Sequence, residues 1–204
     1  MIVTISMEYG TGARAIAAAA AAALNYELVD EQLPVVVAKR LHTSAEVVEA
    51  AEDSRRSVGE RMLAGLELAT PEVLSEPTPE SFDRALLREV QAAIRDYARH
   101  GNVVLVGRAS SLLLGRRPDV VRVFLHAPRA WRVERIAASL DVDEKAAAAE
   151  VDRIDAARRA YVKDWYDVRW GDIDRYDLLL DVSTFGSDGS AGLIVGAVRA
   201  RSNP

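Results

Sequence analysis

Residues Met1–Leu24 read MIVTISMEYGTGARAIAAAAAAAL. They contain a short apolar strand at Ile2–Ser6, a turn with Gly10 and Gly12, and a helix over Ala13–Leu24. Glycines let the backbone approach a ligand closely, and the N–H groups and dipole at a helix N-terminus attract anions. This order of strand, glycine turn and helix predicts a phosphate-binding loop.

Composition narrows the class of protein. The chain has 204 residues, which suits one domain, and its formal net charge is −5 with a pI of about 5.3. The acidic balance argues against a general nucleic-acid binder. Cysteine is absent and the histidines are scattered, so neither disulfides nor a metal site built on these residues is expected. The apolar run 16–24 is too short for a membrane span and no signal peptide is recognisable, so we expect a cytoplasmic protein that binds neither membrane nor nucleic acid.

Strand patterns alternate with helical patterns along the rest of the chain. Apolar runs predict further strands at 27–29, 102–106, 120–125 and 177–182. Helical spacing predicts helices at 35–41, 45–51, 57–68, 81–99, 128–140, 143–164 and 191–201, with a proline-rich loop at 70–79. This alternation predicts an α/β fold with a mostly parallel sheet covered by helices on both faces.

The glycine turn has two interpretations. Residues Gly10–Ala15 fit the dinucleotide fingerprint G-x-G-x-x-A, and Asp30 ends the second strand near the position of a ribose-binding acid. However, a dinucleotide fold needs a third strand soon after the second. Here a long stretch of helix and loop, 31–100, intervenes. An inserted helical region at this point is typical of a nucleoside-monophosphate kinase, so we favour the kinase and retain the oxidoreductase as an alternative.

Several motifs, in the same order along the chain, resemble the cytidylate kinase-like family. The opening ISMEYGTGAR is similar to ISREYGSGGR of that family, and GNVVLVGRA is similar to GNCVIVGRG. The matching segments are Ile5–Arg14, Gly101–Ala109, Arg122–Pro128, Asp155-x-x-Arg158-x-x-Tyr161, Trp170–Asp172 and Tyr176–Leu178. Together they span nearly the whole chain.

The resemblance implies a P-loop kinase-type fold of three layers, with a parallel five-stranded sheet. It implies a single domain in which 31–100 form an inserted helical acceptor-binding region and about 141–172 form a helical lid. The implied reaction is ATP-dependent phosphoryl transfer, with Mg²⁺, to a nucleoside monophosphate, with CMP or dCMP favoured. Catalysis in such enzymes is mainly positioning and charge neutralisation. The expected partner is this small nucleotide, and a homodimer remains an open expectation.

Donor phosphates are expected at the glycine turn. The residues expected to bind them are Gly10, Thr11, Gly12, Ala13 and Arg14. A cation is not favoured at a helix N-terminus, so Arg14 suggests an anionic partner and a substitute for the usual loop lysine. Its alternative role is that of a solvated surface arginine.

Further candidates follow from the resemblance. Arg132 and Arg158 join Arg14 as catalytic candidates, because the planar guanidinium binds phosphate oxygens bidentately. Arg132 and Arg135 lie three residues apart on one helix face. The substrate-binding candidates are Asp30, Arg108 and Asp155. Their alternative roles are a helix N-cap for Asp30, a structural ion pair for Arg108 and a solvated helix face for the others.

The loop departs from the Walker signature G-x-x-x-x-G-K-[ST]. Met7 stands in place of the first glycine, Ala13 in place of the lysine, and Arg14-Ala15 where the metal-binding hydroxyl is expected. We therefore expect no protein ligand for the metal, since magnesium can be held by phosphates and water. The departure also keeps open a nucleotide-binding module without kinase activity.

Overall fold

A computed structural model describes residues 1–30, 32–48 and 79–202 of the chain. The chain divides into two compact units. The first is formed by Met1–Asp30 together with the residues from Ile94 on, and the second by residues 31–93. Expected helices at 57–68 and most of 45–51, and the expected loop at 70–79 up to residue 78, lie outside the described residues.

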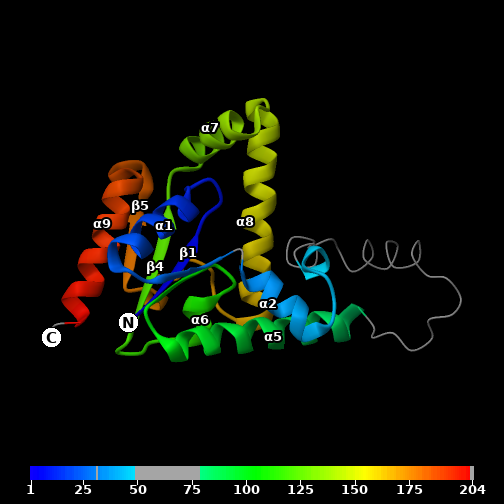
Figure 1. The fold of residues 1–204 in the computed structure, drawn as a ribbon. Coiled ribbons are helices and arrows are strands. Elements are labelled where there is room, and N and C mark those ends of the chain that lie inside the picture. Colours follow the sequence, from blue (N-terminus) through cyan, green and yellow to red (C-terminus); the bar gives the residue numbers. More distant parts are fainter. Residues whose placement is uncertain (31, 49–78, 203–204) are drawn as a thin grey trace, which may run out of the picture. The chain divides into compact units, whose positions relative to one another are not determined.

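The first unit is built on a parallel sheet of five strands in the order β2-β3-β1-β4-β5 (Figure 1). The strands are β1 (Ile2–Met7), β2 (Glu27–Val29), β3 (Val103–Val106), β4 (Val120–His126) and β5 (Leu178–Asp181). All pairings are parallel, and at the centre Ile5 lies opposite both Val106 and Val123. The predicted fold class is confirmed. The strand order also differs from the dinucleotide-binding order 3-2-1-4-5-6, because β3 and not β2 lies beside β1.

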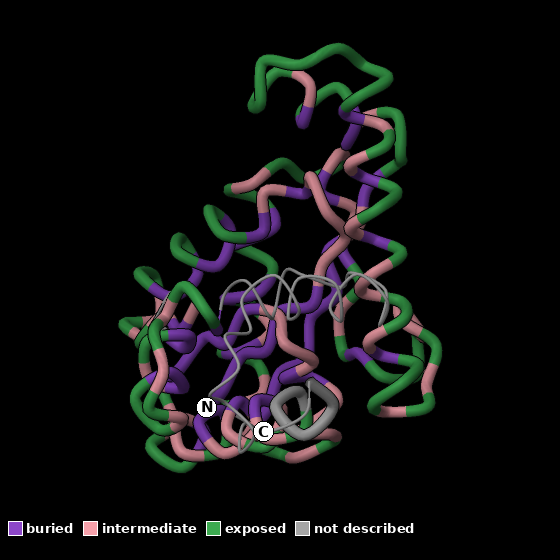
Figure 2. Tube along the Cα trace, turned by 90° about the vertical axis from the view of Figure 1, so that its right-hand side faces the viewer, coloured by how far each residue is buried: buried purple, intermediate pink, exposed green. Residues whose placement is uncertain are grey.

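The central strands are buried on both faces. Every residue of β3 is buried, and β1 and β4 each have a single half-buried residue, at their last position. Figure 2 shows buried residues on the inside of the trace and exposed residues on its outer turns. Continuous apolar runs such as Val103–Val106 suit this environment, because helices cover both sides of a parallel sheet. Because all five strands are parallel, their carboxyl ends meet at one edge of the sheet, where ligands bind in sheets of this kind.

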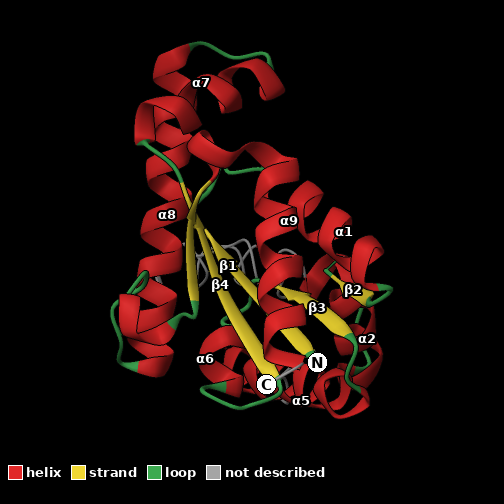
Figure 3. Ribbon diagram, turned by 90° about the vertical axis from the view of Figure 1, so that its left-hand side faces the viewer, coloured by secondary structure: helices red, strands yellow, loops and turns green. Residues whose placement is uncertain are grey.

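Two helices, α1 (Ala13–Leu24) and α9 (Val182–Ser202), lie side by side on one face of the sheet (Figure 3). Buried alanines of α1, such as Ala17 and Ala20, let the helix approach the sheet closely. Helix α9 starts at Val182, well before the predicted 191, and its first part is kinked at Gly186. Glycines in this first part weaken its helical signal, which is why the sequence did not reveal it.

On the other face, a short helix α6 (Ser110–Leu114) was not predicted. It follows a turn in which Gly107, Arg108 and Ala109 all have positive φ, of 71°, 49° and 53°. Ser111 of α6 donates to Thr4 Oγ1 (2.9 Å) and shares a hydrogen bond with Ser6 Oγ (3.2 Å). These buried hydroxyls connect α6 to β1.

After β4 the chain forms a helical hairpin of α7 (Arg129–Leu140) and α8 (Glu144–Tyr166), whose axes are strongly inclined to each other (Figure 1). A small core of Val133, Ile136, Ala147 and Val151 joins the two helices. Asp143 caps α8 by accepting from the Ala146 amide (2.7 Å). A short 3₁₀ helix η1 (Ile173–Arg175) then leads to β5.

The second unit contains α2 (Gln32–Leu41) and the larger part of α5 (Pro79–His100), whose end from Ile94 on belongs to the first unit. Arg40 of α2 lies 3.8 Å from Glu89 of α5. The predicted helices 35–41 and 81–99 correspond to these two. Within the part of the chain that the structure describes, no helix has the length and apolarity needed to cross a membrane.

Candidate phosphate-binding site

The turn between β1 and α1 has the backbone form that the sequence predicted. Gly10 and Gly12 have φ of 87° and 72°, in the left-handed region that favours glycine. Gly12 is the N-cap of α1, which has neither a side-chain cap nor an acidic residue in its first turn. The start of α1 is therefore electropositive and open to an anion. Thr11 is buried, and its hydroxyl donates to the Glu8 carbonyl (2.8 Å), which fixes the turn internally.

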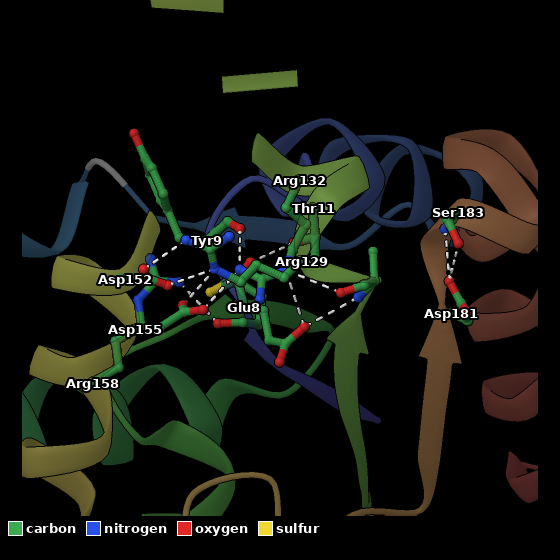
Figure 4. A network of polar contacts seen from close by, with 12 residues as sticks. Glu8, Tyr9, Thr11, Arg129, Arg132, Asp152, Asp155, Arg158, Asp181 and Ser183 are labelled. Carbon is green, nitrogen blue, oxygen red and sulfur yellow. Dashed lines mark hydrogen bonds and ion pairs between the residues drawn. The ribbon is translucent and has the colours of Figure 1, made fainter. Parts of the chain in front are cut away.

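Both backbone groups of Tyr9 are held by the α7–α8 hairpin (Figure 4). The Tyr9 amide donates to Asp155 Oδ1 of α8 (2.9 Å), and Arg132 Nη1 of α7 donates to the Tyr9 carbonyl (2.9 Å). The same Nη1 lies 2.7 Å from Asp155 Oδ2, in an ion pair whose side chains are 6% and 5% exposed. The two helices thus fix the middle of the loop through a buried charged pair.

Glu8 extends this network to the end of β4. Its Oε2 accepts from the Ala127 amide (3.1 Å) and lies 3.3 Å from Arg132 Nε. Arg132 Nε also donates to the Ala127 carbonyl (3.0 Å). The contacts of Arg132 are therefore with the protein, and they are those of a residue that positions the loop. Sequence reasoning did not single out Glu8, although its place directly after β1 was visible.

Arg158 approaches the loop from α8. Its Nη1 donates to the Met7 carbonyl at the end of β1 (2.9 Å), and its guanidinium carbon lies 5.9 Å from the centre of the Tyr9 ring. Burial raises the pKa of the Tyr9 phenol, the nearby Glu150 carboxylate raises it further, and the arginine charges of α8 act in the opposite direction. Arg158 thus brings a positive charge to the carboxyl edge of the sheet.

The other predicted residues form a second group, at the ends of β2 and β3 and the start of α1. Arg14 Nε donates to Asp30 Oδ2 (2.9 Å), with the Arg14 side chain 63% exposed. Arg108 Nη1 donates to the Asp30 carbonyl (3.1 Å) and lies 3.8 Å from Asp30 Oδ1. The structure therefore brings Arg14, Asp30 and Arg108 together, and it brings Arg132, Asp155 and Arg158 together at the loop. Arg14 is engaged with Asp30 in this arrangement.

One further arginine lies at the loop. A Cβ built on Gly12 would stand 3.2 Å from Arg135 Nη2 of α7, so this guanidinium lies against the loop. Its guanidinium carbon lies 4.7 Å from the centre of the Trp131 ring. The helical spacing of Arg132 and Arg135 was visible in the sequence, but which of them is buried depends on how α7 packs.

Among residues 1–30, 32–48 and 79–202, no group of three or more His, Cys, Asp or Glu side chains could hold an ion. The carboxylate of Glu8, which follows β1 directly, is engaged by Arg132. Magnesium often keeps several waters and is bound through substrate phosphates, which needs no such cage. The phosphates of a nucleoside triphosphate suit an uncapped helix N-terminus with arginines near it.

The arrangement of strands and helices defines the class of fold: an α/β fold of P-loop kinase type. An uncharacterized protein from Eubacterium ventriosum shares it with a TM-score of 0.68 at 19% identity, over 98% of this chain and 99% of that chain. Shikimate kinase from Bacteroides thetaiotaomicron has a TM-score of 0.55 at 10% identity, over 100% of this chain and 99% of that chain. At such identities the likeness shows the fold alone.

The chain belongs to the cytidylate kinase-like family, whose profile matches residues 2–184, and the predicted family is thereby confirmed. It is 26% identical to the cytidylate kinase of Halobacterium salinarum, over 98% of this chain and 90% of that protein. It is 27% identical to the cytidylate kinase of Natronomonas pharaonis, with the same coverage of 98% and 90%. The match to the cytidylate kinase of Methanocaldococcus jannaschii is 29% identical but spans only 50% of this chain and 59% of that protein.

Proposed function

We propose that this protein transfers the γ-phosphoryl group of ATP to a nucleoside monophosphate, with CMP or dCMP favoured by the family. The observation that carries the proposal is the uncapped start of α1 behind a glycine turn, with Arg135 beside Gly12 and Arg158 at the end of β1. This combination of backbone amides and guanidinium groups suits a triphosphate chain. Sequence relatives named cytidylate kinases support the choice of acceptor.

In the proposed reaction, an oxygen of the acceptor phosphate attacks the γ-phosphorus. The bond from phosphorus to the bridging oxygen breaks, and ADP leaves with that oxygen. Mg²⁺, arriving with the nucleotide, would neutralise phosphate charge. The chain's own task is to hold donor and acceptor in line and to stabilise negative charge.

The residues have different roles in this proposal. The backbone of Gly10, Thr11, Gly12, Ala13 and Arg14 binds the donor phosphates. Arg158 is the catalytic residue, since it reaches the edge where β1 ends. Arg132 and Asp155 are positioning residues, because both are buried and hold Tyr9.

The acceptor side of the proposal rests on the second group of residues. Asp30 and Arg108, at the ends of β2 and β3, bind the acceptor, and Arg14 orients Asp30. The inserted region 31–100 as acceptor-binding region, the segment 141–172 as lid, the homodimer and the cytoplasmic location stay predictions.

The test is ADP formation from ATP and Mg²⁺ with each nucleoside monophosphate in turn. CMP or dCMP should give the highest kcat/KM. Arg158→Met should lower kcat by roughly 10²–10³-fold, as loss of one charge-stabilising donor does elsewhere. Arg159→Met removes an exposed charge from the next position of α8 and should leave kcat close to that of the parent. No turnover with any monophosphate at high protein concentration would refute the proposal.

A second candidate is a nucleotide-binding module without turnover. The observation that favours it is the engagement of Arg14 with Asp30 in a loop that lacks lysine. Calorimetric binding of ATP without ADP formation would support this candidate, and a kcat that depends on Arg158 would exclude it.

A further inference from the structure

We propose that Arg135 of α7 supplies the positive charge at the donor phosphates that a lysine supplies in the Walker signature, and that Trp131 positions it. The inference rests on the proposed function and assigns a residue within it. The loop has Ala13 where the lysine is expected, so another cation must meet the phosphates if the loop binds them.

Arg135 lies beside the start of α1. Gly12 is the N-cap of α1, and a Cβ added to it would stand 3.2 Å from Arg135 Nη2. The guanidinium therefore lies against the residue from which the electropositive end of α1 begins. An anion bound at this helix start would lie within reach of both the backbone amides and Arg135.

The arginines near the loop differ in how far their charges are compensated. Arg14 is paired with Asp30, and Arg132 with Asp155, so their charges are largely compensated. Arg135 is exposed, and its guanidinium contacts the Trp131 ring beside Gly12. A ring contact leaves the positive charge in place and leaves N–H groups at the edge of the guanidinium able to donate to phosphate oxygens.

Helix α7 is fixed relative to the loop. Gly10 packs so closely on α7 that an added Cβ would stand 3.1 Å from Arg132 Cβ and 3.2 Å from Ile136 Cγ1. Arg132 is also bonded to the Tyr9 carbonyl. Arg135 lies one turn further along the same helix, so its guanidinium is delivered to the loop by a firmly held element. Trp131, at helical distance from Arg135, then restricts its rotamers.

The experiment measures binding of ATP and of inorganic tripolyphosphate by calorimetry, without an acceptor. Arg135→Gln should weaken both by roughly 10–100-fold, as loss of a charged hydrogen bond does. Arg135→Lys keeps the charge and should retain part of the affinity. Trp131→Leu should weaken binding less than Arg135→Gln does, because it removes only the orienting contact. Added guanidinium should restore tripolyphosphate binding to Arg135→Ala.

The matched control is Arg129→Gln, which removes a charge from the same helix but one that pairs with Asp152 (2.7 Å). Its affinity for tripolyphosphate should stay within about 3-fold of the parent. Arg135 is exposed, so its variants should unfold at the parent's temperature, which checks that a lost affinity is not lost folding.

The outcomes separate the two proposals. A parent protein that binds neither ATP nor tripolyphosphate refutes the proposed function and this inference with it. A parent that binds both, with Arg135→Gln binding equally well, refutes the inference and leaves the function standing. A large loss in Arg14→Gln, with none in Arg135→Gln, would assign the lysine's role to Arg14 and refute the inference likewise.

Discussion

Replacing Gly10 by alanine tests the packing of the phosphate loop on α7. Gly10 has φ of +87°, and the added Cβ would stand 3.1 Å from both Arg132 Cβ and the Arg132 carbonyl oxygen. A left-handed L-residue costs about 1–2 kcal/mol. Overpacking against atoms that cannot swing away costs about 1–3 kcal/mol more. The free energy of unfolding should therefore fall by roughly 2–5 kcal/mol, which for a chain of this length corresponds to a Tm lower by roughly 4–20 °C.

Two other glycines separate these contributions. Gly101 is also left-handed, with φ of +69°, but an added Cβ meets nothing within 4 Å, so Gly101→Ala should show the backbone cost alone. Gly192 lies in α9, has open space around it and is not left-handed, so Gly192→Ala should be stabilising by about 0.4–1 kcal/mol. Calorimetric melting of the three variants measures all of these. If Gly10→Ala were no more destabilising than Gly101→Ala, the close contact between loop and α7 would be wrong.

Three further changes test other parts of the fold. Arg132→Met leaves the buried Asp155 charge uncompensated, so the free energy of unfolding in urea should fall by about 3–5 kcal/mol. The double variant Arg132→Met with Asp155→Leu should regain much of this loss. Additive losses in the double variant would contradict the pairing. The pKa of Asp177 is below its ordinary value, because its bonds to Arg122 outweigh the opposing effect of burial. The stability that this pair contributes is present above the ordinary carboxyl pKa of about 4 and is lost as pH falls below it, so Asp177→Asn should flatten the acid limb of a Tm-against-pH curve. Ser111→Ala should cost about 1–3 kcal/mol, because two buried hydroxyls of β1 lose this partner; an unchanged urea midpoint would contradict that arrangement.

The strands could be predicted because each is a short, mainly apolar run, rich in Val, Ile and Leu, that is followed by polar or glycine residues. The sheet order could not be obtained from such patterns, since it depends on which strands pair; the family resemblance implied five parallel strands, and the structure supplies their order. Helix α6 was missed because five residues are too few to show a helical period. The first part of α9 was missed because it contains glycines that lower helix propensity.

The site was predictable to the level of elements but not of side chains. The glycine turn and the edge of the sheet follow from local sequence. Arg132 and Arg158 looked alike in the sequence, yet one is buried against Asp155 and the other reaches the Met7 carbonyl. The difference depends on how α7 and α8 pack on the loop. The pairing of Arg14 with Asp30 was not foreseen either, because it depends on how the start of α1 lies beside the end of β2, and phosphate binding by Arg14 stays a prediction.

The turn at Gly107–Ala109 shows where this chain could be made more robust. Ala109 occupies a left-handed conformation, with φ of 53°, that glycine adopts without steric cost. Backbone strain of about 1–2 kcal/mol is thus stored beside Arg108, and Ala109→Gly would remove the Cβ that causes it. Engineering for thermal stability could therefore start with this substitution. If the variant binds the acceptor less tightly than the parent, the strain contributes to binding; if it binds equally well, the strain has no role there.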